Sequence, residues 1–225
     1  MKFNRLENLI GSFSLEKMKD STVLVIGLGG VGGYVVEALA RSGVGNLILV
    51  DFDKVDITNF NRQIIALDDN VGKYKVVCFK ERTEKINEYC NVVTYNLKID
   101  NDNIKDIFNT KIDFVVDAVD DLGAKVSIVN YCLENNINFI SSMGTGNRLD
   151  PSKLTITTLD KTYNDPLARI MRRKFDKKIQ KKITVCTSLE LPSEVKDKTV
   201  IGSNAFVPSS AGLLIASYII RQIIQ

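Results

Sequence analysis

The chain has 225 residues, of which 44% are hydrophobic and 25% charged, and it carries a formal net charge of +3. These values are ordinary for a soluble globular protein, and the length allows one large domain or two small ones. The sequence contains no histidine, which excludes an imidazole base, a Ser–His dyad and a histidine-bound metal. Its four cysteines form no C-x-x-C pair, so we expect neither a zinc knuckle nor a disulfide framework, and we expect a cytoplasmic location.

The first predicted strand leads into a glycine-rich turn. The stretch TVLVIG (residues 22–27) is a short apolar run, typical of a parallel strand that is covered on both faces. Gly27, Gly29 and Gly32 then give the spacing G-x-G-x-x-G, and a helical pattern follows. In this context the motif indicates a nucleotide phosphate, because glycines let the backbone approach it and the helix N-terminus offers free N–H groups. The alternative is a tight turn without a ligand.

Strand and helix patterns alternate through the first two thirds of the sequence. Further strand-like runs lie at residues 46–51, 91–99, 112–119 and 137–144. Helical patterns lie at residues 33–42, 72–88 and 122–135. This alternation predicts an α/β fold, a Rossmann-like, doubly wound, mainly parallel sheet with helices on both faces. We expect residues 1–150 to form the nucleotide-binding half of a single domain that spans residues 1–225.

Residues 151–225 are expected to extend the same domain on its substrate side. Residues 153–160 and 182–190 have strand character, and residues 207–222 form an apolar helical pattern. Arg221 interrupts this apolar run, which is shorter than the roughly 20 residues of a membrane span. We therefore interpret it as a buried or dimer-packing helix and expect no stable membrane insertion.

A polar stretch, DFDKVDITNFNRQ at residues 51–63, follows the second predicted strand. Asp51 lies where the ribose-binding acid of a dinucleotide fold is expected, and ligands of open α/β sheets bind beyond the carboxyl ends of the strands. A dinucleotide has no evident need for Asn59 and Arg62 beside it. Arg62 and Lys75, facing the glycine turn, would instead suit the negative charge of a triphosphate. The sequence therefore favours ATP over NAD, with an NAD-dependent dehydrogenase as an alternative.

These motifs together resemble one enzyme family. The combination of G-x-G-G-x-G with D-x-D-x-V-x-x-x-N-x-x-R-Q is similar to the signature of the ThiF/MoeB-type adenylating enzymes, relatives of the ubiquitin-activating enzymes. DAVDDLGAK (residues 117–125) is similar to that family's second acidic motif, and residues 5–27 to its N-terminal helix and first strand. The resemblance covers nearly the whole chain, and it implies ATP-dependent adenylation of a carboxylate.

The resemblance also implies roles for individual residues. Asp51 would bind the ribose, Arg62 and Lys75 would hold the phosphates, and Asp120 would lie beside Mg²⁺. Arg5 would reach the phosphates of a partner subunit, which implies a homodimer; the alternative is a solvated N-terminal charge. Arg5, Arg62 and Asp120 form the implied catalytic set. The residues implied to bind ATP are Gly27, Gly29, Gly30, Gly32, Asp51, Asp53, Asn59, Arg62, Lys75, Asp120 and Asp121.

The second half resembles the branch of tRNA threonylcarbamoyladenosine dehydratases. The similar stretches are SSMGTGNRLDPSKL, KTYNDPLARIMRRKF and SNAFVPSSAGLLIASYIIR. In that branch the adenylated carboxylate belongs to a threonylcarbamoyl group on a tRNA adenosine, and an atom of the same group closes onto it. Such an intramolecular nucleophile gains its rate from proximity, so no histidine base is needed. The alternative is adenylation of a sulfur-carrier or ubiquitin-like protein, with a possible sulfur-relay partner.

The segment 169–182 contains eight lysines and arginines and one acid, Asp176. Its local charge is therefore +7, and the rest of the chain carries −4, since the total is +3. Such a concentration predicts a polyanionic partner, here tRNA; the alternative is a solvated helix face. The expected tRNA contacts are Arg169, Arg172, Arg173, Lys174, Lys177 and Lys178.

Cys186 has two interpretations. Its thiol either captures an activated acyl group or packs in the core. Because free cysteines are among the most buried residues, we favour the core.

Overall fold

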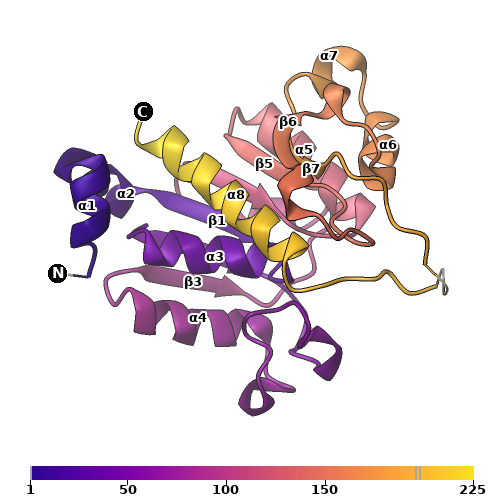
Figure 1. Ribbon diagram of the computed structural model, residues 1–225. Coiled ribbons are helices and arrows are strands. Elements are labelled where there is room, and N and C mark those ends of the chain that lie inside the picture. The colour runs from indigo at the N-terminus through magenta and orange to yellow at the C-terminus, as the bar shows by residue number, and fades with distance from the viewer. Residues whose placement is uncertain (1, 196, 198) are drawn as a thin grey trace.

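The computed structural model describes residues 2–195, 197 and 199–225. A seven-stranded sheet organises them, with the strand order β3-β2-β1-β4-β5-β7-β6 (Figure 1). Neighbouring strands are parallel except β6, which runs antiparallel to β7. The predicted mainly parallel sheet with a C-terminal extension is confirmed. The strands are β1 Thr22–Ile26, β2 Asn46–Val50, β3 Asn91–Tyr95, β4 Phe114–Asp117, β5 Phe139–Ser142, β6 Leu154–Thr158 and β7 Thr184–Ser188.

Helices cover both faces of the sheet, as predicted. Val23 and Val25 of β1 belong to a core shared with α2, α3, α4 and α8, whereas Leu24 and Ile26 belong to a core shared with α5 and α6. Both sets are apolar because neighbouring side chains of a strand point to opposite, covered faces. The helices are α1 Asn4–Ile10, α2 Ser12–Asp20, α3 Gly32–Arg41, α4 Lys75–Ile86, α5 Leu122–Glu134, α6 Pro166–Arg172, α7 Lys177–Gln180 and α8 Val207–Ile223.

Helix α8 packs along α3, as Figure 1 shows. The two helices approach closely at Gly212, where a Cβ atom would lie 2.4 Å from the carbonyl oxygen of Val31. Ile215 and Ile219 of α8 are fully buried, so the apolar run is a packed helix, which confirms that part of its interpretation. No helix in the described part of the chain is both long enough and apolar enough to cross a membrane.

Two segments differ from the expectation. The N-terminal region forms two helices rather than one, because Gly11 interrupts it with a φ of 81°, a conformation that glycine adopts at little cost. The basic segment forms no single helix face. Helix α6 ends at Arg172, and α7 begins after Asp176, whose side chain accepts a hydrogen bond from the backbone N–H of Ile179.

Candidate nucleotide-binding site

The glycine turn between β1 and α3 lies at the carboxyl edge of the sheet. Gly27 has a φ of 87°, and a Cβ there would lie 2.6 Å from the carbonyl oxygen of Ala118. A Cβ at Gly32 would lie 1.8 Å from the carbonyl oxygen of Gly27. The shape of the turn itself therefore requires these two glycines. At Gly29, among described residues, an added Cβ would meet nothing closer than Gln63 Nε2 at 3.9 Å, which leaves room for a ligand.

Asp51 ties the end of β2 to this turn. Its Oδ2 accepts a hydrogen bond of 2.6 Å from the backbone N–H of Leu28, and its Oδ1 accepts one of 2.7 Å from Asp53. Burial raises the pKa of Asp51 above its ordinary value, while the charge of Lys75 and both N–H groups oppose the shift. The carboxylate thus lies beside the glycine turn, at the position expected of a ribose acceptor.

Lys75 begins α4 and is buried. Its Nζ lies 2.8 Å from Asp53 Oδ2, and its backbone N–H donates to the carbonyl oxygen of Asp53. Asp53 therefore holds the Lys75 ammonium close to Asp51. This contact brings together three residues that the sequence assigned to the ATP site.

The segment 56–63 packs against the glycine turn through Arg62 and Gln63. Asn59 is buried, and its Oδ1 accepts a hydrogen bond of 3.1 Å from the backbone N–H of Asp56, which closes a capping box. Arg62 Nη1 donates to the Thr58 carbonyl oxygen at 2.7 Å. A Cβ at Gly30 would lie 3.4 Å from Arg62 Cγ. Asn59 thus shapes the segment, and Arg62 lies beside the turn.

Gln63 is the last residue of the polar stretch, and no role was predicted for it from the sequence. Its Oε1 is a buried oxygen without a hydrogen-bond partner among the described residues. Leaving a buried acceptor unpaired costs about 1–3 kcal/mol, so such a group suggests a missing donor. Because Gln63 is the nearest side chain to Gly29, a hydroxyl or amino group of a bound nucleotide fits this position.

The loop after β4 reaches the same turn. The backbone N–H of Ala118 donates to the Ile26 carbonyl oxygen at 2.8 Å. Asp121 caps α5 by accepting a hydrogen bond of 2.8 Å from the Ala124 N–H. Asp120 is exposed and has no ion-pair partner in the described residues. Asp120 is thus available to a ligand, whereas Asp121 has a structural partner.

A metal ion at this site would need oxygen atoms from a ligand. Among the described residues, no group of three or more His, Cys, Asp or Glu side chains is arranged to hold one. The exposed carboxylate of Asp120 fits a hard cation such as Mg²⁺ when phosphate oxygens complete its coordination.

A buried ion pair, which was not predicted from the sequence, supports the Asp120 loop. Lys125 Nζ lies 2.9 and 3.0 Å from the two carboxylate oxygens of Asp117, and Ser141 Oγ donates to Asp117 at 2.5 Å. All three side chains are fully buried. Asp117 therefore has a structural role in this geometry.

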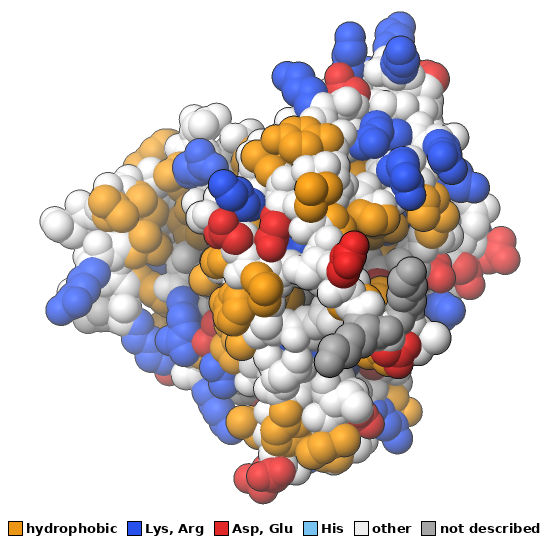
Figure 2. Space-filling model, turned by 45° about the vertical axis from the view of Figure 1, so that its right-hand side comes forward, with side chains coloured by type: hydrophobic (Ala, Val, Ile, Leu, Met, Phe, Trp, Pro, Cys, Tyr) orange, Lys and Arg blue, Asp and Glu red, His pale blue; other side chains and the backbone are white. Residues whose placement is uncertain are grey.

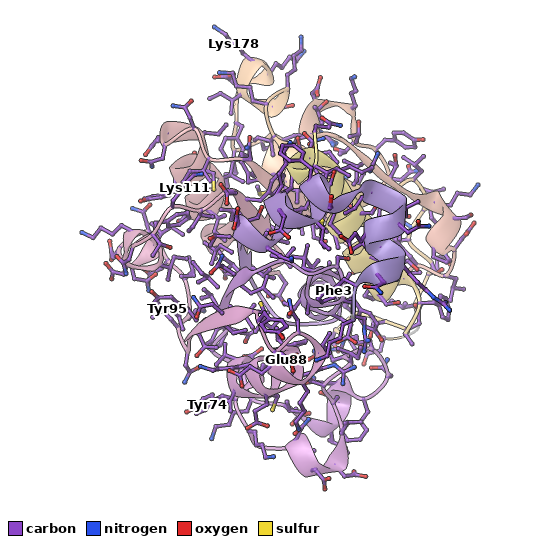
Figure 3. All side chains as sticks on the ribbon, turned by 90° about the vertical axis from the view of Figure 1, so that its left-hand side faces the viewer. Phe3, Tyr74, Glu88, Tyr95, Lys111 and Lys178 are labelled. Carbon is purple, nitrogen blue, oxygen red and sulfur yellow. The ribbon has the colours of Figure 1, made fainter. Side chains whose placement is uncertain are left out.

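Arg5 lies far from the glycine turn of its own chain. Helix α1 is at the amino edge of the sheet, opposite the carboxyl edge (Figure 1). Lys2 forms a 3.3 Å ion pair with Glu88, and Phe3 packs near Gly43, the turn that precedes β2. Figure 3 looks onto this edge, with Phe3 and Glu88 labelled. Within one subunit the structure does not bring Arg5 to the other candidate residues.

The basic segment forms a separate surface at the top of the molecule. Figure 2 shows Lys and Arg side chains gathered there, over α6 and α7, and Figure 3 shows Lys178 at the tip. Arg172 differs because it is half-buried, and its Nη1 donates to the Thr162 carbonyl oxygen at 2.9 Å. Of the six expected tRNA contacts, five are exposed: Arg169, Arg173, Lys174, Lys177 and Lys178.

Cys186 is a core residue, as predicted. Its side chain is 1% exposed, and burial, with a smaller effect from Asp165, raises its pKa to about 12. A thiol in this state is a poor nucleophile, because the thiolate is the reactive form.

Comparison with known proteins shows where this arrangement recurs. Residues 3–225 match the model of the ThiF family. The chain belongs to the ThiF family. A Bacillus subtilis (strain 168) tRNA threonylcarbamoyladenosine dehydratase is 39% identical over 100% of this chain and 95% of its own length. The Escherichia coli (strain K12) enzyme of the same name is 38% identical over 77% of this chain and 65% of its own length.

The fold has the same counterpart among solved structures. The crystal structure of E. coli tRNA N6-threonylcarbamoyladenosine dehydratase in complex with ATP has a TM-score of 0.94 and is 31% identical, covering 99% of this chain and 93% of that one. E. coli MccB with ATP has a TM-score of 0.71 at 23% identity, a likeness of fold alone. This ThiF-family chain therefore shares its whole architecture with an ATP-binding relative.

Proposed function

We propose that this ThiF-family chain is an ATP-dependent tRNA threonylcarbamoyladenosine dehydratase. It adenylates the carboxylate of the threonylcarbamoyl group on a tRNA adenosine, and dehydrative cyclisation then releases AMP, with pyrophosphate as the other product. The observation that carries this proposal is the end-to-end similarity to the B. subtilis dehydratase, which covers both the nucleotide-binding half and residues 151–225. A structure of the E. coli relative with AMP supports the same chemistry.

The described residues account for the adenylation step. Gly29 leaves room for phosphates beside the N-terminus of α3, and Asp51 accepts hydrogen bonds from the ribose hydroxyls. Arg62, which lies beside Gly30, and Lys75, which pairs with Asp53, offset the charge that develops as pyrophosphate leaves. Asp120 is the residue that would hold Mg²⁺ together with phosphate oxygens, and the ion would supply further charge neutralisation.

Cyclisation places fewer demands on the protein. The attacking atom belongs to the same threonylcarbamoyl group as the activated carboxylate, so proximity supplies much of the rate. A chain without histidine and with a buried Cys186 suits this reaction better than one that needs a protein nucleophile or an imidazole base. The C-x-x-C pairs that we expect of a sulfur-carrier activating enzyme are also absent from the sequence.

We also propose that the working enzyme is a cytoplasmic homodimer. Arg5 lies at the edge of the sheet opposite its own site, so it acts on phosphates bound to the partner subunit. The exposed basic residues of α6 and α7 contact tRNA phosphates. Any sulfur-relay partner stays a prediction from the family resemblance.

Mass analysis of tRNA nucleosides tests the function. The full chain is incubated with Mg²⁺, ATP and tRNA that carries threonylcarbamoyladenosine. The expected result is loss of one water from that nucleoside, with one AMP formed per product. An unchanged nucleoside, with adenylation of the C-terminus of a small carrier protein and release of pyrophosphate instead, would support the sulfur-carrier alternative.

A further inference from the structure

A hollow of about 300 Å³ lies beside α6, at the foot of the basic segment. Two arginines, Arg169 and Arg172, line it together with Pro166 and Pro192. Asn164 and Asp165 complete its lining. The two arginines of this hollow are thus set in a recess beside proline rings, whereas the lysines of α7 are exposed.

Arg172 is held in place before any ligand binds. Its Nη1 donates to the carbonyl oxygen of Thr162 at 2.9 Å and also to Thr162 Oγ1. Gln180 Nε2 in turn donates to the carbonyl oxygen of Arg172 at 2.8 Å. A guanidinium has five N–H donors, so donors beyond those of Nη1 remain for a ligand. Arg169 lies three residues earlier on α6, a spacing that places both side chains on one face of the helix.

Asp165 is an acid in the lining, but its carboxylate already has partners. Its Oδ1 accepts a hydrogen bond of 2.9 Å from the Ala168 N–H. Its Oδ2 accepts bonds of 3.0 Å from the Gly144 N–H and 2.9 Å from Thr187 Oγ1. Within the described residues neither Arg169 nor Arg172 forms an ion pair. Both arginines are therefore available to an anion from outside.

The hollow shares the carboxyl edge of the sheet with the glycine turn. Gly144, which donates to Asp165, follows the end of β5 at Ser142. Strand β5 pairs with β4, with Ser141 opposite Asp117, and β4 pairs with β1. An RNA strand bound in the hollow thus lies on the same edge as the candidate ATP site.

We infer that this hollow binds one backbone phosphate of the tRNA close to the modified nucleotide, with Arg169 and Arg172 as its ligands. This inference rests on the proposed function. Arginine suits the task because its planar, forked guanidinium matches phosphate oxygens bidentately, whereas lysine acts as a point charge. The lysines of α7 attract the polyanion at long range, and the hollow fixes its register.

Single-phosphate neutralisation tests the inference. A tRNA anticodon stem-loop carrying threonylcarbamoyladenosine is prepared with one phosphate at a time replaced by a neutral methylphosphonate, and its affinity for the full chain is measured. One position is expected to lower the affinity of the parent about tenfold, the effect of losing a charged hydrogen bond. The variants Arg169→Gln and Arg172→Lys should bind the stem-loop with all its phosphates more weakly than the parent does. Their affinity should no longer fall when the phosphate at that position is neutralised.

Lys85→Gln is the matched control, because it removes one positive charge from an exposed lysine in the last turn of α4, outside the basic segment. This variant should keep the full response at the sensitive position. If Arg169→Gln gave the same profile as the parent and as Lys85→Gln, the hollow would not be a phosphate site. Conversion of intact tRNA by the parent is measured in parallel. A phosphate footprint without AMP formation would contradict the proposed function alone, and AMP formation without a footprint would contradict the hollow alone.

Discussion

Asp120 and Arg62 are the side chains that we propose act most directly in the adenylation step. Asp120 is exposed beside the glycine turn, and Arg62 is held there by the carbonyl oxygen of Thr58. Asp120→Asn and Arg62→Ala should each lower kcat for AMP formation on the order of 10²–10³-fold, because each removes charge stabilisation in the transition state. Steady-state kinetics with a fixed saturating tRNA concentration measures this loss.

Asp102→Asn provides the control for both variants, because Asp102 is an exposed surface residue remote in sequence from every motif of the site. It should keep the kcat of the parent. Near-normal turnover of Asp120→Asn would remove Asp120 from the reaction.

Cys186 permits a prediction about reactivity and pH. A pKa of about 12 leaves roughly 10⁻⁴ of this thiol as thiolate at pH 8, far less than for an ordinary cysteine. Native protein should therefore react very slowly with iodoacetamide at Cys186 between pH 7 and 9, and quickly once urea unfolds it. Peptide mass mapping after a timed pulse measures the labelling. Rapid, selective labelling of Cys186 in the native state would contradict this prediction and support its role in capturing an activated acyl group.

Helix α5 contains a lysine that stabilises the fold from within. Lys125→Met leaves the Asp117 carboxylate buried without its cation, so it should lower the free energy of unfolding by about 3–5 kcal/mol. Urea denaturation measures the change. Lys80→Met on α4 removes the same side chain from an exposed pair with Glu84 at 3.9 Å, and it should cost less than about 1 kcal/mol. Equal costs for the two variants would contradict the burial argument.

The same helix shows how far the sequence leads and where it stops. Apolar runs and glycine spacing predicted β1, α3 and the position of Asp51, because these depend on contacts local in the chain. Lys125 gave no such signal, since a lysine in a helical pattern is usually exposed. Its partners Asp117 and Ser141 come together through the pairing of β4 with β5. Asp117, an acid that ends an apolar strand, was the one hint of a buried partner.

The candidate site repeats this division between local and long-range information. Gln63 was visible as a polar residue, but its unpaired Oε1 depends on how the segment 56–63 packs against Gly29. The hollow at Arg169 and Arg172 likewise requires the segment after β7 to return over α6, as the position of Pro192 shows. Charge composition predicted the basic surface and could not separate its arginines from its lysines.

For the whole molecule, the position of Arg5 makes a homodimer testable. If Arg5 acts on the partner's phosphates, Arg5→Ala and Arg62→Ala subunits should each be inactive alone. A mixed dimer joins the intact Arg62 of one subunit with the intact Arg5 of the other at one of its two sites. Co-expressed in equal amounts, the pair should regain roughly a quarter of the parent activity. Absence of recovery in verified mixed dimers would contradict the action of Arg5 on the partner's phosphates, and an Arg5→Ala variant that is active alone would place Arg5 outside the site.

The contact between α8 and α3 has a consequence for biosynthesis. Pro208, at the start of α8, lies beside Gly30 of the nucleotide turn, and Gly212 fits against Val31. A ribosome makes the glycine turn well before α8, so the packing of the turn stays incomplete until residues 207–223 have been made. Strand β6 likewise cannot join the sheet at once, because β7, which is made later, lies between it and β5. A nascent chain therefore exposes the apolar side of α3, and lacks a finished nucleotide pocket, until α8 has left the ribosome.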